Sequence, residues 1–347
     1  MNYKRILLIL SGLLIMVLIL WYIGIDTIIN AIKEANPYLI LLALGLQIIS
    51  FFLLTARWHL VNRATDVDVT FFSLLPMTIV GMAVNNITPS ARGGGEPVRA
   101  YILTKKYNIP FERTLASVVA DRSLDMFPFI LLAIVTIISM ILTFNISLSV
   151  SIILSICVVG VVAAFVLVII VCINKEWGER IVNWGLRQIR RFYKKKEGIL
   201  EERVLGAVEG FQTSMKDLLT NKKLMLIGML LSLLIWIFEI LRVYVIFLAF
   251  GSSVSIFVIG AVFIISSLVG MIPLLPGGLG VIEGLMITLY SLEGVTRSIS
   301  AAVTVVERLI SYWFVVILGL AILPYYGTSI IDDALHKNED LENEKID

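Results

Sequence analysis

The sequence contains few of the residues that disulfide-bonded and metal-dependent proteins use. It has two cysteines and two histidines among 347 residues. Cys157 and Cys172 belong to one predicted helix, where a rise of about 1.5 Å per residue separates them by roughly 22 Å and excludes a disulfide between them. His59 and His336 are distant in sequence and have no cluster of ligand residues beside them. The sequence therefore indicates no disulfide framework, no metal site and no bound cofactor.

Charged residues are also scarce, and their scarcity defines the class of protein. Only 16% of the residues are charged, whereas 59% are hydrophobic and the mean hydropathy is +0.95. These values lie outside the range of soluble domains. The composition predicts an integral membrane protein, and no nucleic-acid partner is expected.

Apolar segments of about 18 residues or more predict the membrane crossings. Two further apolar segments, at residues 70–104 and 254–294, are interrupted at their middles by proline and glycine. Backbone groups freed at such a break cannot face lipid, so we expect each break to be buried in protein or to line a wet cavity. The six uninterrupted segments are residues 6–25, 38–56, 114–143, 148–173, 224–250 and 298–324.

Lysine and arginine predict the orientation, because they accumulate in cytoplasmic loops. Lys4 and Arg5 place the N-terminus inside, and Arg57 marks the loop after residues 38–56 as cytoplasmic. The loop after residues 70–104 is basic as well. Both loops can be cytoplasmic only if residues 70–104 form a re-entrant hairpin that enters from the cytoplasm and returns to it.

The second broken segment is expected to enter from the opposite side, because a basic linker precedes the span at residues 224–250. The predicted fold class is an all-α polytopic membrane protein with about six full transmembrane helices and two glycine-broken re-entrant hairpins that form an inverted-topology repeat. The alternative is that one or both broken segments span the membrane fully.

The linker either binds anionic lipid at the interface or simply satisfies the topology rule. The predicted units are an N-terminal membrane repeat at residues 1–173, a basic amphipathic cytoplasmic linker at 174–223, a C-terminal membrane repeat at 224–326 and an acidic cytoplasmic tail at 327–347.

The two broken segments begin copies of one motif. A proline and a glycine run precede a glutamate. An acid–arginine dipeptide follows, and its arginine comes 32 to 33 residues after the proline. Glycine breaks with ionisable groups, placed twice inside apolar sequence, are typical of a transporter core built by duplication. The first copy comprises Pro89, Gly93, Gly94, Gly95, Glu96 and Asp121-Arg122, and the second comprises Pro276, Gly277, Gly278, Gly280, Glu283 and Glu307-Arg308.

Ionisable residues inside the apolar segments are the candidate binding residues, because an ionised group in mid-membrane costs at least a few kcal/mol unless it is paired or hydrated. Every cation among them is arginine, whose planar fork suits bidentate binding of phosphate or carboxylate. Glu239 and Arg242 share one helix face and are predicted to pair, and Asp121 and Asp125 share a face beside Arg122. The full set is Arg92, Glu96, Arg99, Asp121, Arg122, Asp125, Glu239, Arg242, Glu283, Glu307 and Arg308.

The glycine runs predict a second device for binding an anion. Free N–H groups and the positive dipole end of a half-helix point toward whatever lies at the break. We therefore expect Arg92, Arg122 and Arg308, together with glycine amides, to hold a lipid phosphate, while the neighbouring acids hold the arginines when the site is empty. The alternative is a passive network, in which arginines neutralise acids and glycines allow close helix packing.

The strings NNITPSARGGGEPVRA, DRSLD, PLLPGGLGVIE and VERLISYW resemble the flippase-like transmembrane domain family, which forms the membrane half of lysylphosphatidylglycerol synthases. The likeness covers residues 5–325. It implies an integral membrane domain that moves lipids, or lipid-linked headgroups, between leaflets. The soluble aminoacyl-transfer domain of the synthases is not expected after the last span, so lipid aminoacylation is not carried over. Other members resemble this chain in standing alone or are fused to glycosyltransferases, which keeps polyprenyl phosphates among the possible substrates.

An enzymatic function finds little support in the residues, since no nucleophile motif or phosphate-binding P-loop is present. Asp121 and Asp125 could serve as a metal-binding pair for phosphoryl transfer, although Arg122 between them already supplies a counter-charge. The sequence predicts a multi-pass protein of the cell membrane with both termini cytoplasmic and no cofactor. The expected partners are anionic or phosphate-linked lipids, and the alternatives are a second copy in a homodimer or a lipid-modifying enzyme. The alternative function is a membrane-embedded enzyme or accessory subunit that acts on polyprenyl phosphate or phospholipid headgroups.

Overall fold

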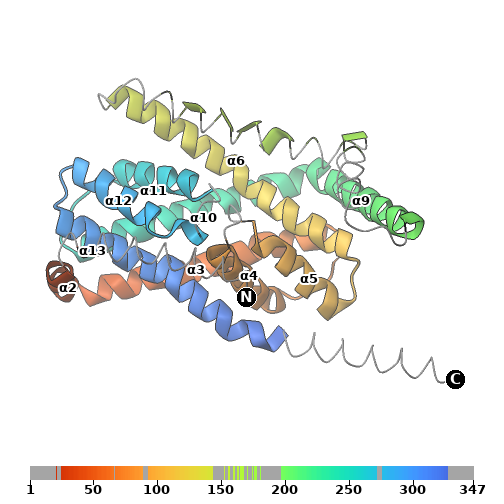
Figure 1. Cartoon of the computed structure of the whole chain (residues 1–347), viewed down its shortest axis with the longest axis horizontal. Coiled ribbons are helices and arrows are strands. Elements are labelled where there is room, and N and C mark those ends of the chain that lie inside the picture. The colour runs from red at the N-terminus through yellow and green to blue at the C-terminus, as the bar shows by residue number, and fades with distance from the viewer. Residues whose placement is uncertain are drawn as a thin grey trace.

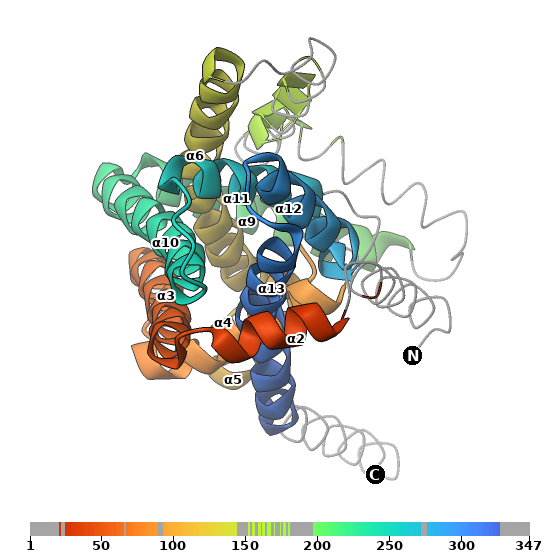
Figure 2. The same ribbon diagram turned by 90° about the vertical axis from the view of Figure 1, so that its left-hand side faces the viewer.

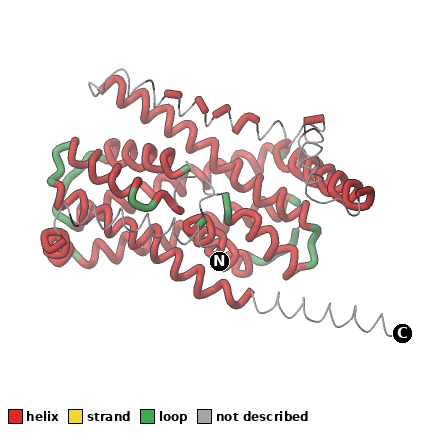
Figure 3. Tube along the Cα trace, in the orientation of Figure 1, coloured by secondary structure: helices red, strands yellow, loops and turns green. Residues whose placement is uncertain are grey.

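The computed structural model describes residues 25–65, 67–88, 93–143, 197–271 and 276–326, together with Trp21 and scattered residues between 152 and 180. Within this part of the chain all regular structure is helical (Figure 3). Most of the predicted spans at residues 6–25 and 148–173, most of the linker before residue 197, and the tail after residue 326 lie outside the described residues.

Three helices among the described residues are long and apolar enough to cross a membrane. They are α3 at Pro37–Ala64, α10 at Lys222–Ala249, and a C-terminal helix at Arg297–Tyr326. The last begins as α13, Arg297–Arg308, and passes through the π-helical turn η2, Leu309–Trp313. The protein is therefore a polytopic helical membrane protein, as predicted, and Figure 1 shows these helices running lengthwise through it.

Helix α3 corrects one prediction. The sequence ends this span near residue 56 and assigns Arg57 to a cytoplasmic loop, but the helix continues to Ala64 and Arg57 is buried within it. A charged residue in an apolar sequence indicates the end of a membrane span only when water is the sole partner that can stabilise the charge. Arg57 has two carboxylate partners on another helix, so the helix continues through it.

Helices α3 and α10 pack against each other along their lengths, and the 33-residue helix α6, Phe111–Thr143, packs against both (Figure 2). Asparagine caps begin the two long helices. The Asn36 side chain accepts hydrogen bonds from the first amides of α3, and the Asn221 side chain accepts one from Leu224 N in α10. Two amphipathic helices cover the edges: α2, Ile25–Glu34, contacts α13, and α9, Glu197–Thr220, contacts α6.

Each broken segment consists of two short helices that pack on each other. The first comprises α4, Phe71–Ile87, and α5, Gly95–Tyr107. The second comprises α11, Ile256–Gly270, the 3-10 turn η1, Pro276–Gly278, and α12, Val281–Leu292. The breaks lie where the proline and glycine runs predict them.

The backbone at both breaks requires glycine. A Cβ atom at Gly95 would lie 2.0 Å from the carbonyl oxygen of Gly81, so α4 and α5 meet backbone to backbone. In the second segment, Gly277, Gly278 and Gly280 have φ angles of 56°, 65° and 81°, in the left-handed region that disfavours other residues.

The ends of the two hairpins meet in the middle of the protein. Turn η1 contacts α4, and a Cβ atom at Gly277 would lie 2.9 Å from the carbonyl oxygen of Asn86. The Tyr312 hydroxyl, in the π-helical turn, donates to the same oxygen at 3.1 Å. Among the described residues of the breaks, Gly95, Gly278 and Gly280 are buried, as the polarity of free backbone groups requires.

Candidate functional site

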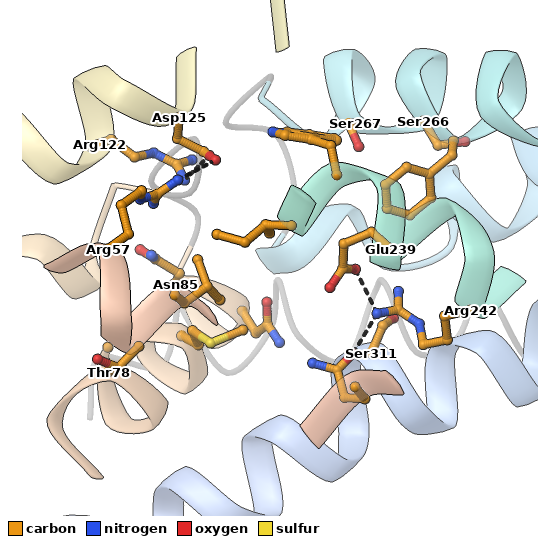
Figure 4. Close-up of a pocket in the computed structure, with 18 of the residues that line it drawn as sticks. Arg57, Thr78, Asn85, Arg122, Asp125, Glu239, Arg242, Ser266, Ser267 and Ser311 are labelled. Carbon is orange, nitrogen blue, oxygen red and sulfur yellow. Dashed lines mark hydrogen bonds and ion pairs between the residues drawn. The ribbon is translucent and has the colours of Figure 1, made fainter. Parts of the chain in front are cut away.

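A polar cavity of about 210 Å³ lies between the long helices and the two hairpins. Helices α3, α4, α5, α6, α10, α11, α12 and α13 all contribute to its wall. Figure 4 shows Arg57, Arg122 and Asp125 on one side of this space, and Glu239 and Arg242 on the other. Its charged lining is formally balanced and consists of Arg57, Arg99, Arg122, Arg242 and Arg308 with Glu96, Asp121, Asp125, Glu239 and Glu307.

The acid of each acid–arginine dipeptide forms an ion pair with an arginine on a long helix earlier in the chain. Arg57 Nε in α3 lies 2.8 Å from Asp121 Oδ1 in α6. Arg242 Nη2 in α10 lies 3.1 Å from Glu307 Oε1 in α13. The partners are 64 residues apart in the first half and 65 in the second. The same ion pair, at nearly the same spacing, therefore recurs in both halves.

The arginine of each dipeptide faces the glutamate at the start of the second hairpin helix. Arg308 Nε lies 2.5 Å from Glu283 Oε1, whereas Arg122 Nε lies 3.8 Å from Glu96 Oε1. The same arginine–glutamate contact thus occurs in both halves, but it is shorter in the second half than in the first.

The first cluster is centred on Arg57, whose side chain is 2% exposed. Its Nη1 atom donates to Asp125 Oδ1 and to Ser232 Oγ, each at 2.8 Å. Arg99 Nη2 reaches the other oxygen of Asp121 at 3.0 Å, and the Arg99 guanidinium lies 4.0 Å from the ring centroid of Trp58. Removing one member of such a buried group costs about 3–5 kcal/mol, because its partner remains charged and buried.

The second cluster is centred on Arg242, which is as buried as Arg57. Its Nη1 atom lies 2.6 Å from Glu239 Oε2, which confirms the predicted pairing of these neighbours on one helix face. The same atom donates to Gln47 Oε1 in α3 at 2.5 Å. Arg242 thereby joins α3, α10 and α13, and the Glu239 side chain remains 19% exposed.

Arg308 and Glu283 bind the second hairpin to α13. Arg308 Nη2 donates to the carbonyl oxygen of Gly277 at 2.9 Å, and the Tyr312 ring lies 5.1 Å from the guanidinium. Glu283 Oε2 accepts a hydrogen bond from Gly280 N, so both carboxylate oxygens have a partner. Both oxygens of Glu283 are therefore occupied by the protein, and the Nε and Nη2 atoms of Arg308 are held by Glu283 and Gly277.

Several polar atoms around the cavity are buried without a hydrogen-bond partner among the described residues. They include Glu96 Oε2 and Arg99 Nε in the first half, and Arg242 Nε and Ser266 Oγ in the second. Leaving such a group unpaired costs roughly 1–3 kcal/mol, and more when it is charged. The Arg122 side chain is 32% exposed, more than any other ion-paired side chain of the cavity. Unsatisfied groups beside an accessible arginine favour occupation by a polar ligand or by water.

The structure brings nine predicted site residues to the cavity wall, and Glu283 and Gly277 contact one of them, Arg308. Arg92 lies outside the described residues, and Gly93 to Gly95 are absent from the lining. The Gly95 amide donates to Asn85 Oδ1 at 2.7 Å and the Gly280 amide to Glu283, so these two predicted anion-binding amides are occupied by the protein. The nine are Glu96, Arg99, Asp121, Arg122, Asp125, Glu239, Arg242, Glu307 and Arg308.

Arg57, the most connected cation of the first cluster, was not among the site residues predicted from the sequence. The separations of Arg57 from Asp121 and of Arg242 from Glu307 differ by one residue, and this regularity could have identified it. Gln47, Asn85 and Ser232 were also missed, because single amides and hydroxyls in apolar helices carry no distinctive spacing.

The two aspartates of α6 are already bound by protein cations. Asp121 contacts Arg57 and Arg99, and Asp125 contacts Arg57 and Arg122. Within the described part of the chain, no group of three histidine, cysteine or carboxylate side chains is placed to hold a metal ion. A phosphoryl-transfer centre based on these aspartates would first require the arginines to move away.

Comparison with known proteins places this architecture in a family. A UPF0104 membrane protein of Methanothermobacter thermautotrophicus is 47% identical over 97% of this chain and its own full length. A UPF0104 membrane protein of Methanocaldococcus jannaschii is 33% identical over 91% of this chain and 93% of its own length. Glycosyltransferase AglD of Haloferax volcanii is 24% identical over 86% of this chain, which corresponds to 51% of that protein.

The family model described as the lysylphosphatidylglycerol synthase TM region matches residues 8–319, which include both hairpins and both acid–arginine dipeptides. This match confirms the resemblance found in the glycine motifs. The chain belongs to the family of the lysylphosphatidylglycerol synthase transmembrane region.

Proposed function

We propose that this protein binds the phosphate-bearing headgroup of an anionic lipid in the polar cavity and carries it between the two leaflets of the cell membrane. The observation that carries this proposal is a cavity lined by five arginines and five acids, which lies between apolar helices and both hairpins. Ionisable groups gathered at such a place are costly in a membrane protein and have a use where a charged group must pass through the membrane.

The topology proposed from the sequence supports this function. Helices α4, α5, α11 and α12 contain 17, 13, 15 and 12 residues. A transmembrane helix needs about 20, so each arm is too short to cross a bilayer alone. We propose that both hairpins are re-entrant, that they enter from opposite sides, and that both chain termini are cytoplasmic.

In the proposed mechanism, the headgroup enters the cavity while its hydrocarbon chains remain in the bilayer. Arg122 is the cation best placed to receive a phosphate, because it is the most exposed and has the loosest partner. Displacement of one repeat against the other then opens the cavity to the opposite leaflet. The buried pairs Arg57–Asp121 and Arg242–Glu307 hold the helices in register on either side of the moving headgroup.

A liposome assay tests the proposal. The purified full chain is reconstituted with a trace of fluorescent phosphatidylglycerol, and dithionite is added outside to bleach only the outer-leaflet label. We expect bleaching to extend to the inner-leaflet lipid, and the Arg122→Gln variant to lose this activity. Arg113→Gln is the matched control, because Arg113 is an exposed arginine on the same helix. Bleaching that stops at the outer leaflet for every phosphate-bearing lipid would exclude transport.

The relative named glycosyltransferase AglD supports a second candidate function. In that case the chain presents a polyprenyl phosphate to a separate enzyme, as an accessory subunit, without moving it across the membrane. Polyprenyl phosphate would then raise the unfolding temperature of the purified protein, while the liposome assay would show no translocation of any lipid.

A further inference from the structure

The two halves of the cavity are built alike but are not equally occupied. In the second half, Glu283 has a hydrogen bond on each oxygen, and Arg308 is bonded to both Glu283 and Gly277. In the first half, Glu96 accepts a weak hydrogen bond from Asn85 Nδ2 at 3.4 Å on one oxygen and has no partner on the other. The glutamate of the first half is therefore open to a ligand, whereas the glutamate of the second half is already paired on both oxygens.

The open site needs both a hydrogen-bond donor and an acceptor. Glu96 Oε2 is a buried acceptor without a donor, and Arg99 Nε is a buried donor without an acceptor. Arg122 adds a guanidinium that contacts Asp125 at 3.2 Å and reaches Glu96 only at 3.8 Å. A ligand that is only an anion would satisfy the arginines but would leave the carboxylate oxygen of Glu96 unpaired and repelled.

The charge balance leads to the same requirement. The cavity is lined by five arginines and five acids, so its formal charge offers no net attraction for a bare anion. Selection of the ligand must then come from the pattern of hydrogen-bond donors and acceptors, because the charge of each lining group is already neutralised by a neighbour.

We propose that the site selects a phosphate headgroup that carries a hydroxyl donor close to the phosphate. The phosphate oxygens accept from Arg122 and Arg99, and the hydroxyl donates to Glu96 Oε2. Arg308 and Glu283 act as a latch between the second hairpin and α13 and do not contact the headgroup. This inference rests on the proposed binding of a lipid phosphate and adds the chemistry of the group attached to it.

Phosphatidylglycerol and phosphatidylpropanol test the inference. Both have one negative charge and a three-carbon headgroup, but only the first has hydroxyl donors. Thermal unfolding of the purified full chain is measured in nanodiscs that contain increasing mole fractions of either lipid, with the same hydrocarbon chains. Because a hydrogen bond to the charged Glu96 would favour phosphatidylglycerol, half-maximal stabilisation should need about a tenfold lower mole fraction of phosphatidylglycerol than of phosphatidylpropanol.

Two variants locate the preference. Glu96→Met removes the acceptor at nearly constant volume, so the two lipids should stabilise this variant at equal mole fractions. Glu283→Gln weakens the latch and should lower the unfolding temperature, yet it should keep the preference for phosphatidylglycerol. If Glu283→Gln abolishes the preference and Glu96→Met keeps it, the assignment of open site and latch is wrong.

The outcomes separate this inference from the proposed function. Equal stabilisation of the unmodified protein by both lipids would overturn the hydroxyl requirement and leave phosphate binding intact. Stabilisation by neither lipid would overturn both proposals. Soluble glycerol 3-phosphate is added to protein in neutral-lipid nanodiscs as a further arm, and stabilisation equal to that by the lipid would assign the site to a free phosphate ester.

Discussion

Arg57 offers the most direct test of the buried ion-pair network. The Arg57→Met substitution keeps an unbranched side chain in α3 but removes three interactions, at 2.8 Å to Asp121, Asp125 and Ser232. Loss of one partner from a buried ion pair destabilises by about 3–5 kcal/mol. Asp121 keeps Arg99 and Asp125 keeps Arg122, so we expect a loss near the lower limit, about 3 kcal/mol.

The loss is measured by reversible denaturant unfolding of the purified protein, followed by tryptophan fluorescence. Arg63→Met is the control, because Arg63 is an exposed arginine on the same helix and its removal should change the free energy of unfolding by less than about 0.5 kcal/mol. Without Arg57, the carboxylates Glu96, Asp121 and Asp125 face only two arginines, Arg99 and Arg122. The double variant Arg57→Met/Asp121→Asn should therefore recover part of the loss, because it removes the excess negative charge. An Arg57→Met protein as stable as the Arg63→Met protein would refute the buried network as a source of stability.

Three further predictions follow from the site and the hairpins. Arg122→Lys should slow lipid translocation with little change in unfolding temperature, because lysine lacks the bidentate fork. Arg308→Lys should instead lower the unfolding temperature. The opposite pattern would contradict the assignment of Arg308 to a latch. Gly95→Ala should destabilise strongly, because its Cβ would lie 2.0 Å from a carbonyl oxygen, while Gly45→Ala, with nothing within 4 Å, should be neutral or stabilise by up to about 1 kcal/mol. A cysteine at Lys105 should react with an impermeant maleimide only from the cytoplasmic side, and labelling from outside would show that the first hairpin crosses the membrane.

The sequence predicted the helical class, the positions of both helix breaks and nine residues of the cavity wall. These features depend on local properties: hydropathy over about 20 residues, the conformational freedom of glycine, and the cost of charge in an apolar segment. The extent of α3 was not predictable in the same way, because it depends on carboxylates 64 and 68 residues away from Arg57. The unequal pairing of Glu96 and Glu283 is likewise a result of tertiary packing, since the two motifs look alike in sequence.

The pairing of each acid–arginine dipeptide has a mechanical consequence. Adjacent residues on an α-helix point about 100° apart around its axis. Asp121 therefore lies against Arg57 of α3 and Arg99 of α5, while Arg122 faces Glu96 at the start of α5, so one turn of α6 contacts the long helix and the hairpin. A small rotation of α6 that drew Arg122 toward Glu96 would turn Asp121 away from Arg57. A rotation of α6 would therefore change its contacts with the long helix and with the hairpin at the same time.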